Sequence, residues 1–310
     1  MLSLLIPLHN WNATQLVQQL YLQLADTQMP FEIIIADDAS DKSYQTFYES
    51  LQGYPFVQII RSEKNMGRAA IRNFLFSRAQ YPYLLFIDCD AGIYSDHFIS
   101  QYINFILQHE RTPLYAVSGG VAYRDEKPPK NQYLRWYYGR RREELPAKKR
   151  KQQPYRSFTL FNLLLSKQIF EKITFDSQFT SYGNEDTFFG MQLEKLQIPV
   201  YHIDNPLYHD GLDENDVYLQ KIESSIQNLS RLLKEKKVND SFIKNYRLLY
   251  LYTILKQLRL LPFFTVFYRL FAPYLKKKLL HSPKIWQIDM FKLGNLVQIK
   301  SLCCNDINED

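Results

Sequence analysis

The sequence predicts an α/β protein whose mostly parallel sheet carries helices on both faces, followed by a helical C-terminal region. Two observations lead to this prediction. Through the first half of the chain, apolar segments of strand length alternate with helical segments, and the apolar segments lack the polar alternation of a half-exposed strand. From Asp213 onward the pattern is almost entirely helical. A chain of 310 residues is long enough for one large domain and an appendage.

The first half supplies four strands and the helices between them. We expect strands at Ser3–Leu8, Phe31–Ala36, Phe56–Arg61 and Tyr83–Asp88. We expect helices at Ala13–Thr27, Lys42–Gln52 and Met66–Ala79. Such a sheet binds ligands beyond the carboxyl ends of its strands, where the strand order switches.

The pattern becomes less regular after the fourth strand. Further strands are expected at Leu114–Val121, Phe158–Leu165 and Val200–Ile203. The acidic pair Glu185-Asp186 opens a helix that runs to about Leu196, because the helix dipole favours acids in a first turn. Residues Arg124–Tyr155 are polar, basic and contain prolines, so we predict a long loop there.

We place a domain boundary near Leu212, which divides the chain into residues 1–211 and 212–310. Pro262 and Pro273 interrupt the tail and predict short helices there instead of one long rod. Two interpretations of the tail are open. Its helices pack on the first domain, or its aromatic and basic residues bind an anionic membrane surface.

The net charge of +6 is concentrated in one segment. Seven bases lie between Gly139 and Lys151, namely Arg140, Arg141, Arg142, Lys148, Lys149, Arg150 and Lys151. Three interpretations are open: a solvated loop, a grip on an anionic acceptor, or contact with anionic lipid head groups.

Three cysteines, Cys89, Cys303 and Cys304, make neither a disulfide framework nor a structural zinc site. The N-terminus lacks the features of a signal peptide, and no uncharged apolar run approaches the ~20 residues that span a bilayer. We therefore expect a cytoplasmic protein, either free or bound at the inner face of the membrane.

The segment Leu84–Ala91 is an apolar run that ends in two carboxylates, Asp88 and Asp90, separated by Cys89. Because side chains alternate along a strand, both acids are expected to point the same way. On this motif alone, a solvated turn and a divalent cation site remain equally open. Polar side chains also follow two other strands, at His9 and at Asp37-Asp38, so we expect one shared site.

Six motifs occur in order through the first two thirds of the chain. They are Ile6-Pro7-Leu8-His9-Asn10, Ile35-Ala36-Asp37-Asp38-Ala39-Ser40, Asn65-Met66-Gly67-Arg68-Ala69-Ala70-Ile71-Arg72-Asn73, Asp88-Cys89-Asp90, Gly183-Asn184-Glu185-Asp186 and His209. This set resembles glycosyltransferase family 2, nucleotide-sugar-dependent enzymes of the GT-A fold. The resemblance implies a catalytic domain over 1–211, with a nucleotide-sugar-binding half (1–122) and an acceptor-side half (123–211) that includes the basic loop 124–156.

The resemblance implies a donor site for a UDP-sugar. Asp38 is expected to accept a hydrogen bond from the uracil ring, or else to cap the helix that follows it. His9 stands where relatives stack an aromatic ring on the base. Arg68 and Arg72 would neutralise the diphosphate or fix Asp38 or Asp88, with a basic surface face as the alternative for Arg68. The expected donor-binding residues are Pro7, His9, Asp38, Asn65, Gly67, Arg68, Arg72 and Asp88.

The resemblance also implies a metal and a base. Asp90 is expected to bind Mn²⁺ or Mg²⁺ directly, Asp88 to contact the ribose or the metal through water, and His209 to complete the shell. Asp186 is expected to be the catalytic base of an inverting transfer, with Glu185 orienting donor hydroxyls.

The implied function is a hexosyltransferase-type glycosyltransferase that acts on a glycan or lipid-linked acceptor in surface polysaccharide synthesis. One alternative is a sugar-1-phosphate nucleotidyltransferase, although no glycine-rich loop with a lysine follows the first strand. The other is a non-catalytic membrane or nucleic-acid scaffold. Acid clusters at strand ends disfavour nucleic acid, because carboxylates repel its phosphates.

Overall fold

The computed structural model describes residues 1–112, 114–179, 182–235, 237, 238, 242, 243 and 246–305, with the backbone alone for 301–305. The side chains of Cys303 and Cys304 therefore lie outside the described part. Contacts within the chain define two compact units. The first contains Met1–Asp125, Gly139–Thr180 and Glu185–Gly211, and the second contains Glu126–Tyr138, Ser181–Asn184 and Leu212–Asp310. Segments 126–138 and 181–184, which the sequence analysis placed in the first 211 residues, thus group with the second unit.

A seven-stranded sheet forms the centre of the first unit, in the order β3-β2-β1-β4-β8-β6-β9. Its strands are β1 (Leu2–Leu8), β2 (Phe31–Asp37), β3 (Val57–Arg61), β4 (Tyr83–Ile87), β6 (Ala116–Ser118), β8 (Asn162–Ser166) and β9 (Val200–His202). Strands β1 to β4 are parallel to one another, whereas β8 runs antiparallel to both β4 and β6. The mostly parallel α/β sheet is therefore confirmed.

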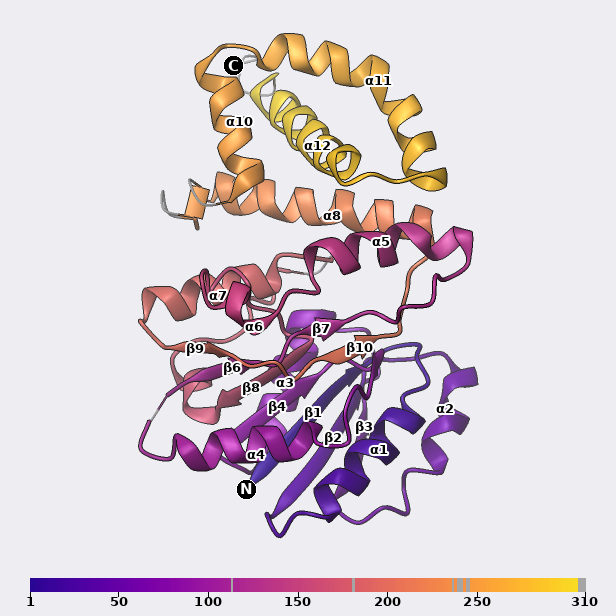
Figure 1. Cartoon of the computed structure of the whole chain (residues 1–310), viewed down its shortest axis with the longest axis vertical. Helices are drawn as coiled ribbons and strands as arrows, with labels where there is room; N and C mark the ends of the chain where they lie inside the picture. The colour runs from indigo at the N-terminus through magenta and orange to yellow at the C-terminus, as the bar shows by residue number, and fades with distance from the viewer. Residues whose placement is uncertain (113, 180–181, 236, 239–241, 244–245, 306–310) are drawn as a thin grey trace. The chain divides into compact units, whose positions relative to one another are not determined.

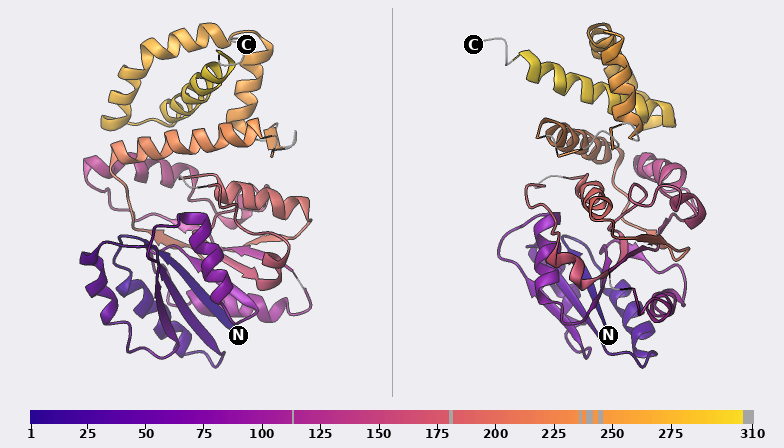
Figure 2. Two further views of the ribbon diagram at one scale, coloured as in Figure 1. Left: turned by 180° about the vertical axis from the view of Figure 1, so that it is seen from behind. Right: turned by 90° about the vertical axis from the view of Figure 1, so that its left-hand side faces the viewer.

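Helices cover both faces of this sheet, which is why its central strands are apolar throughout. Helices α1 (Thr14–Ala25) and α4 (Phe98–Gln108) lie together on one face, and α3 (Arg68–Arg78) lies on the other (Figures 1 and 2). The first unit also contains α2 (Lys42–Glu49), the 3₁₀ helix η2 (Lys167–Glu171) and α7 (Glu185–Lys195). Helix α4 was not predicted, although its buried residues follow a helical stripe: Phe98, Ile99, Tyr102, Phe105 and Ile106.

A second sheet of three short strands lies in the same unit, in the order β5-β10-β7. These strands are β5 (Ala91–Gly92), β7 (Val121–Ala122) and β10 (Leu207–His209). The sequence predicted one strand over Leu114–Val121, but the chain leaves the main sheet after β6 and joins the small sheet as β7. Gly120, at a positive φ of 97°, makes that change of direction, a conformation glycine adopts without steric cost.

The basic segment is helical, so the prediction of a long loop over Arg124–Tyr155 was wrong. It contains η1 (Lys130–Gln132), α5 (Tyr133–Arg142) and α6 (Ala147–Arg150). Arg150 is buried, and its guanidinium donates to the carbonyl oxygens of Leu145, Ser118, Gly119 and Ile203. One of the seven bases is therefore a core residue that holds backbone carbonyls together.

The second unit consists mainly of α8 (Asn215–Lys234), α10 (Arg247–Gln257), α11 (Leu261–His281) and α12 (Ile285–Asn305). Pro262 lies in the first turn of α11, where its missing N–H is tolerated. Pro273 lies inside α11, so the predicted break there was wrong, although the helix curves along its length in Figure 1. Three buried side chains, Tyr268, Leu275 and Leu279, hold the helix on both sides of this proline. Among the helices that the structure describes, none combines the length and the apolarity of a membrane span.

Candidate active site

The carboxyl ends of β1 and β2 are tied together by backbone and side-chain contacts. The Asp38 N–H donates to the Leu8 carbonyl at 2.7 Å, and His9 Nδ1 lies 2.8 Å from the Asp38 carbonyl oxygen. Because that oxygen only accepts, Nδ1 carries the proton of this contact. Asn65 Nδ2 lies 3.4 Å from the same nitrogen. The His9 ring is exposed, so its face is open for stacking on a base.

Asp38 holds the loop that opens α3. Its side chain is buried, and its two oxygens accept the backbone N–H groups of Met66 at 2.6 Å and Gly67 at 3.0 Å. Gly67 has a φ of 83°, which explains a glycine immediately before the helix. Each carboxylate oxygen has a second lone pair that a ligand N–H can use. Pro7 pairs with Ala36 in the ladder between β1 and β2.

Asp88 and Asp90 have different partners, and neither lies within a strand, as the prediction for this pair had assumed. Strand β4 ends at Ile87, and the next residues form a turn in which Ala91 N–H donates to the Asp88 carbonyl at 3.1 Å. Strand alternation therefore does not apply to the acids. Asp88 Oδ1 lies 2.5 Å from Nη2 of Arg72, and Arg72 is buried.

Asp90 instead lies beside His209, because the small sheet brings β10 against β5. His209 pairs with Ala91 in that sheet, and Asp210 N–H donates to the Asp90 carbonyl at 3.0 Å. His209 Nε2 is 3.9 Å from Asp90 Oδ2. A Cβ on Gly211 would lie 2.3 Å from that same oxygen, so only glycine leaves room for the carboxylate here.

Two aromatic rings stack on the His209 ring, a feature that no motif of the sequence indicated. Phe161 and Tyr123 stack on it, with centroid distances of 5.2 and 5.7 Å. Tyr123 is itself held, since its hydroxyl donates to Glu143 Oε2 at 2.5 Å. Nothing in the local sequence signals this arrangement, because the three rings come from separate segments.

The pair Asp90 and His209 fits a divalent cation. Within the described residues, no group of three or more His, Cys, Asp and Glu side chains is arranged to hold a metal ion. A carboxylate and an imidazole suit Mn²⁺, and Mg²⁺ is commonly bound by one or two carboxylates together with substrate phosphates. A cation at this pair would therefore need a diphosphate and water as its other ligands. Asp88 is not part of this pair, because its carboxylate forms an ion pair with Arg72.

Glu185 and Asp186 begin α7 and lie near the two arginines of α3. Arg68 Nη1 is 3.8 Å from Oε1 of the buried Glu185. Asp186 Oδ1 accepts the backbone N–H of Thr187 at 2.6 Å. Burial is the main cause that raises the pKa of Asp186 to about 7, and repulsion from Glu185 adds to it. The hydrogen bonds with Thr187 and the charge of Arg72 oppose the shift. A carboxyl with a pKa near neutrality is suited to take a proton during catalysis.

Three segments that are distant in sequence thus meet in one charged cluster. Arg68 and Arg72 come from α3, Asp88 follows β4, and Glu185 with Asp186 begins α7. This cluster lies beyond the carboxyl ends of β1 and β4, where the strand order switches. Arg124, which no motif of the sequence indicated, makes two hydrogen bonds to Asp210, at 2.7 and 2.8 Å.

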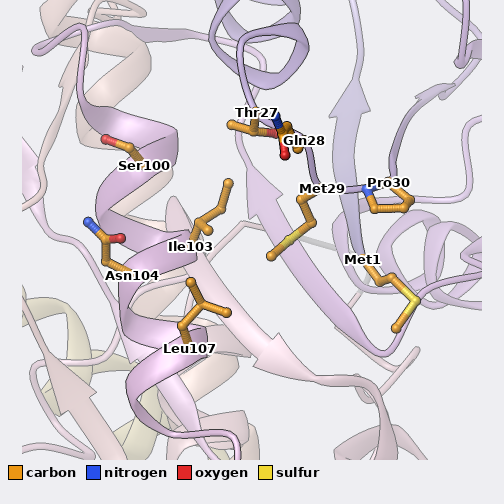
Figure 3. Close-up of a pocket in the computed structure, with 9 residues that line it drawn as sticks. All are labelled: Met1, Thr27, Gln28, Met29, Pro30, Ser100, Ile103, Asn104 and Leu107. Carbon is orange, nitrogen blue, oxygen red and sulfur yellow. The ribbon is translucent and has the colours of Figure 1, made fainter.

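A cavity of about 480 Å³ lies at the other end of the strands (Figure 3). It is formed where β1 and β2 begin, and the residues that line it are Met1, Thr27, Gln28, Met29, Pro30, Ser100, Ile103, Asn104 and Leu107. None of these nine side chains is charged, so the cavity lacks the basic and acidic side chains of the cluster at the carboxyl ends of the strands.

The sequence also matches the model of a known protein family. The model of glycosyl transferase family 2 matches residues 3–174, more than half of the chain. The chain belongs to glycosyltransferase family 2. It is 30% identical over 126 residues to an uncharacterized glycosyltransferase of Haemophilus influenzae, an alignment that covers 40% of this chain and 48% of that one.

A second relative is the chondroitin synthase of Pasteurella multocida, 24% identical over 62% of this chain and 23% of that protein. The chain thus spans about half or less of the length of these curated relatives. Among solved structures, the mannosyltransferase PcManGT of Pyrobaculum calidifontis, in complex with GDP-Man and Mn²⁺, matches with a TM-score of 0.54 at 10% identity. The match covers 99% of this chain and 81% of that one, which supports the GT-A fold.

Proposed function

We propose that this glycosyltransferase moves a sugar from a UDP-sugar to a hydroxyl of a glycan or lipid-linked acceptor, with inversion at the anomeric carbon. The observation that carries the proposal is the charged cluster of Arg68, Arg72, Asp88, Glu185 and Asp186 at the switch point of the sheet. It combines cations for a diphosphate with a carboxyl whose pKa of about 7 suits a base.

Asp186 is the base in this proposal. The acceptor oxygen attacks the anomeric carbon, and its proton passes to the Asp186 carboxylate. The bond between that carbon and the phosphate oxygen breaks, and UDP leaves with the electron pair. A single displacement of this kind inverts the anomeric configuration. Glu185, held near Arg68, is positioned to orient donor hydroxyls.

Arg72 and Asp88 organise the donor in this proposal. The ion pair fixes the Asp88 carboxylate, whose second oxygen remains an acceptor for a ribose hydroxyl. His9 stacks on the uracil. Asp38 accepts a hydrogen bond from the N–H of the uracil ring, and the same carboxylate fixes the loop from Asn65 to Gly67.

Asp90 and His209 would hold the divalent cation, Mn²⁺ or Mg²⁺. When bound, such a cation neutralises the charge that develops on the departing diphosphate. The rings of Tyr123 and Phe161 keep His209 in place for this role. The mannosyltransferase with the similar fold contains Mn²⁺, which supports this choice of cofactor.

The proposal predicts a specific binding pattern in calorimetric titrations. UDP should bind more tightly than GDP, and Mn²⁺ should strengthen the binding of UDP. Asp90→Ala should remove the effect of Mn²⁺, and Asp186→Asn should keep UDP binding while losing sugar transfer. Equal affinity for UDP and GDP would contradict the assignment of the base-binding residues. Near-normal transfer by Asp186→Asn would exclude Asp186 as the base.

The proposed acceptor is an intermediate of surface polysaccharide synthesis, and similarity to a relative supports this choice. The relative in Pasteurella multocida is named for the synthesis of chondroitin, a polysaccharide. Incubation of the enzyme with a UDP-sugar and a panel of oligosaccharide and lipid-linked acceptors tests this assignment. Release of free sugar in every case, with no acceptor glycosylated, would contradict it.

A further inference from the structure

Helix α11 carries an apolar stripe on its solvent side. Five large apolar side chains, at three- and four-residue spacing, are each between 50% and 78% exposed: Phe263, Val266, Phe267, Leu270 and Tyr274. This spacing places all five on one face of the helix. Contiguous exposed apolar surface of this kind marks an interaction site.

The opposite face of α11 is anchored, so the stripe cannot turn inward by rotation of the helix. Tyr268 is buried, and its hydroxyl donates to the Phe291 carbonyl of α12 at 3.4 Å and accepts from Asn295 Nδ2 at 3.2 Å. A Cβ on Gly294 would lie 2.1 Å from the Tyr268 ring, so the two helices approach closely at this glycine. Lys276, beside the buried face, pairs with Glu223 of α8 at 2.8 Å.

Exposed lysines continue the stripe. The face that carries the apolar residues continues into Lys277 and Lys278, which are both exposed. From Ser241 to Ile288 the sequence contains no acid and nine bases: Lys244, Arg247, Lys256, Arg259, Arg269, Lys276, Lys277, Lys278 and Lys284. An apolar face rich in aromatic side chains and flanked by bases has the composition of an interfacial helix.

We infer that α11 docks the protein on an anionic phospholipid surface, with Phe263, Phe267 and Leu270 entering the boundary between head groups and acyl chains. Charge complementarity favours an anionic lipid surface over a second copy of the chain. A second copy would bring a further pair of exposed lysines to this face, whereas an anionic lipid surface supplies the opposite charge to Lys277 and Lys278. The inference goes beyond the proposed function, because attachment to a membrane requires neither donor nor metal.

Sedimentation of the full chain with lipid vesicles tests this inference. The probes are vesicles of phosphatidylcholine mixed with phosphatidylglycerol, and vesicles of phosphatidylcholine alone. The test variants are the double substitutions Phe267→Ser with Leu270→Ser, and Lys277→Gln with Lys278→Gln. The matched controls are Leu22→Ser, an exposed leucine of α1, and Lys148→Gln with Lys149→Gln, exposed lysines of α6.

We expect the wild-type chain to bind the anionic vesicles and not the neutral ones. Each test variant should bind about tenfold more weakly, because apolar burial and basic charge both contribute to interfacial binding. The control variants should bind as the wild type does. Circular dichroism melting curves check that every variant is folded, and UDP binding checks the active site independently.

Two results would overturn the inference. One is vesicle binding that is unchanged in both folded test variants, or absent in the wild type. The other is a concentration-dependent dimer of the wild-type chain, seen by analytical ultracentrifugation, that the Phe267→Ser and Leu270→Ser variant loses. That second result would assign the stripe to a second copy of the chain.

Discussion

Arg72 Nη2 lies 2.5 Å from Asp88 Oδ1, so a buried guanidinium of α3 fixes a carboxylate at the end of β4. Arg72→Ala would leave Asp88 without its cation. We expect this variant to lose about 2 kcal/mol of folding free energy, below the 3–5 kcal/mol for a fully buried pair because Asp88 is partly exposed. We also expect weaker UDP binding, measured by calorimetry. Arg78→Ala, an exposed arginine on the same helix, is the control, and an equal loss in both variants would contradict the special role of Arg72.

Gly211 keeps space for the Asp90 carboxylate. A methyl group at this position would lie 2.3 Å from Asp90 Oδ2, so Gly211→Ala should displace the carboxylate from His209. We expect the strengthening of UDP binding by Mn²⁺ to fall about tenfold, because one of the two ligands proposed for the cation is then misplaced. Binding of UDP without metal should change little. Titrations of UDP with and without Mn²⁺ measure both effects.

Gly53→Ala is the matched control for Gly211, because a Cβ at Gly53 meets no atom within 4 Å. This variant should keep the full effect of Mn²⁺. A Gly211→Ala variant with the same response as the wild type would show that Asp90 does not bind the cation in its present position.

The sequence predicted the parallel half of the fold well, and physical reasons explain where it failed. β1, β2 and β4 are buried on both faces, so each is a continuous apolar run that can be recognised in the sequence. β5, β7 and β10 are two or three residues long and have no such pattern. Their small sheet forms only through pairing between distant segments, which local sequence does not encode.

The candidate site shows the same division. Motif resemblance selected Asp88, Asp90 and His209 as candidates. Strand alternation does not apply to the two acids, because β4 ends at Ile87. The stacking of Tyr123 and Phe161 on His209 depends on the tertiary fold and could not be read from spacing. Pro273 predicts a helix end from sequence alone, whereas packing on both sides of it keeps α11 continuous.

Arg150 tests the revised interpretation of the basic segment. Its guanidinium satisfies several buried carbonyls, including those of Ser118 and Gly119, so Arg150→Ala leaves these acceptors without a donor. We expect a loss of about 3 kcal/mol in folding free energy, measured by urea unfolding. Lys149→Ala, an exposed neighbour, should change stability by less than about 0.5 kcal/mol. An Arg150→Ala variant as stable as the wild type would show that these hydrogen bonds do not stabilise the fold.

Asp186 makes the folded state less stable as the pH rises. Its pKa is raised from 3.8 to about 7, so the folded state holds a proton that the unfolded state has already released. Stability should therefore fall between about pH 4 and pH 7. Asp186→Asn removes this ionisation and should melt at a higher temperature than the wild type above pH 7. Glu194→Gln, an exposed acid of the same helix, should not reproduce the gain.

The proton affinity of Asp186 should also set the pH dependence of sugar transfer. A base must be ionised to accept the acceptor proton, so the rate should rise with pH through about 7. Glu185→Gln removes the charge that repels the Asp186 carboxylate, and burial and the opposing charge of Arg72 remain. The rise should then move to lower pH, whereas Glu194→Gln should leave it in place. Initial rates over the pH range, with saturating donor and Mn²⁺, measure the shift. A loss of rate in Glu185→Gln with no movement of the pH profile would mean that Glu185 acts on the donor and does not tune the base.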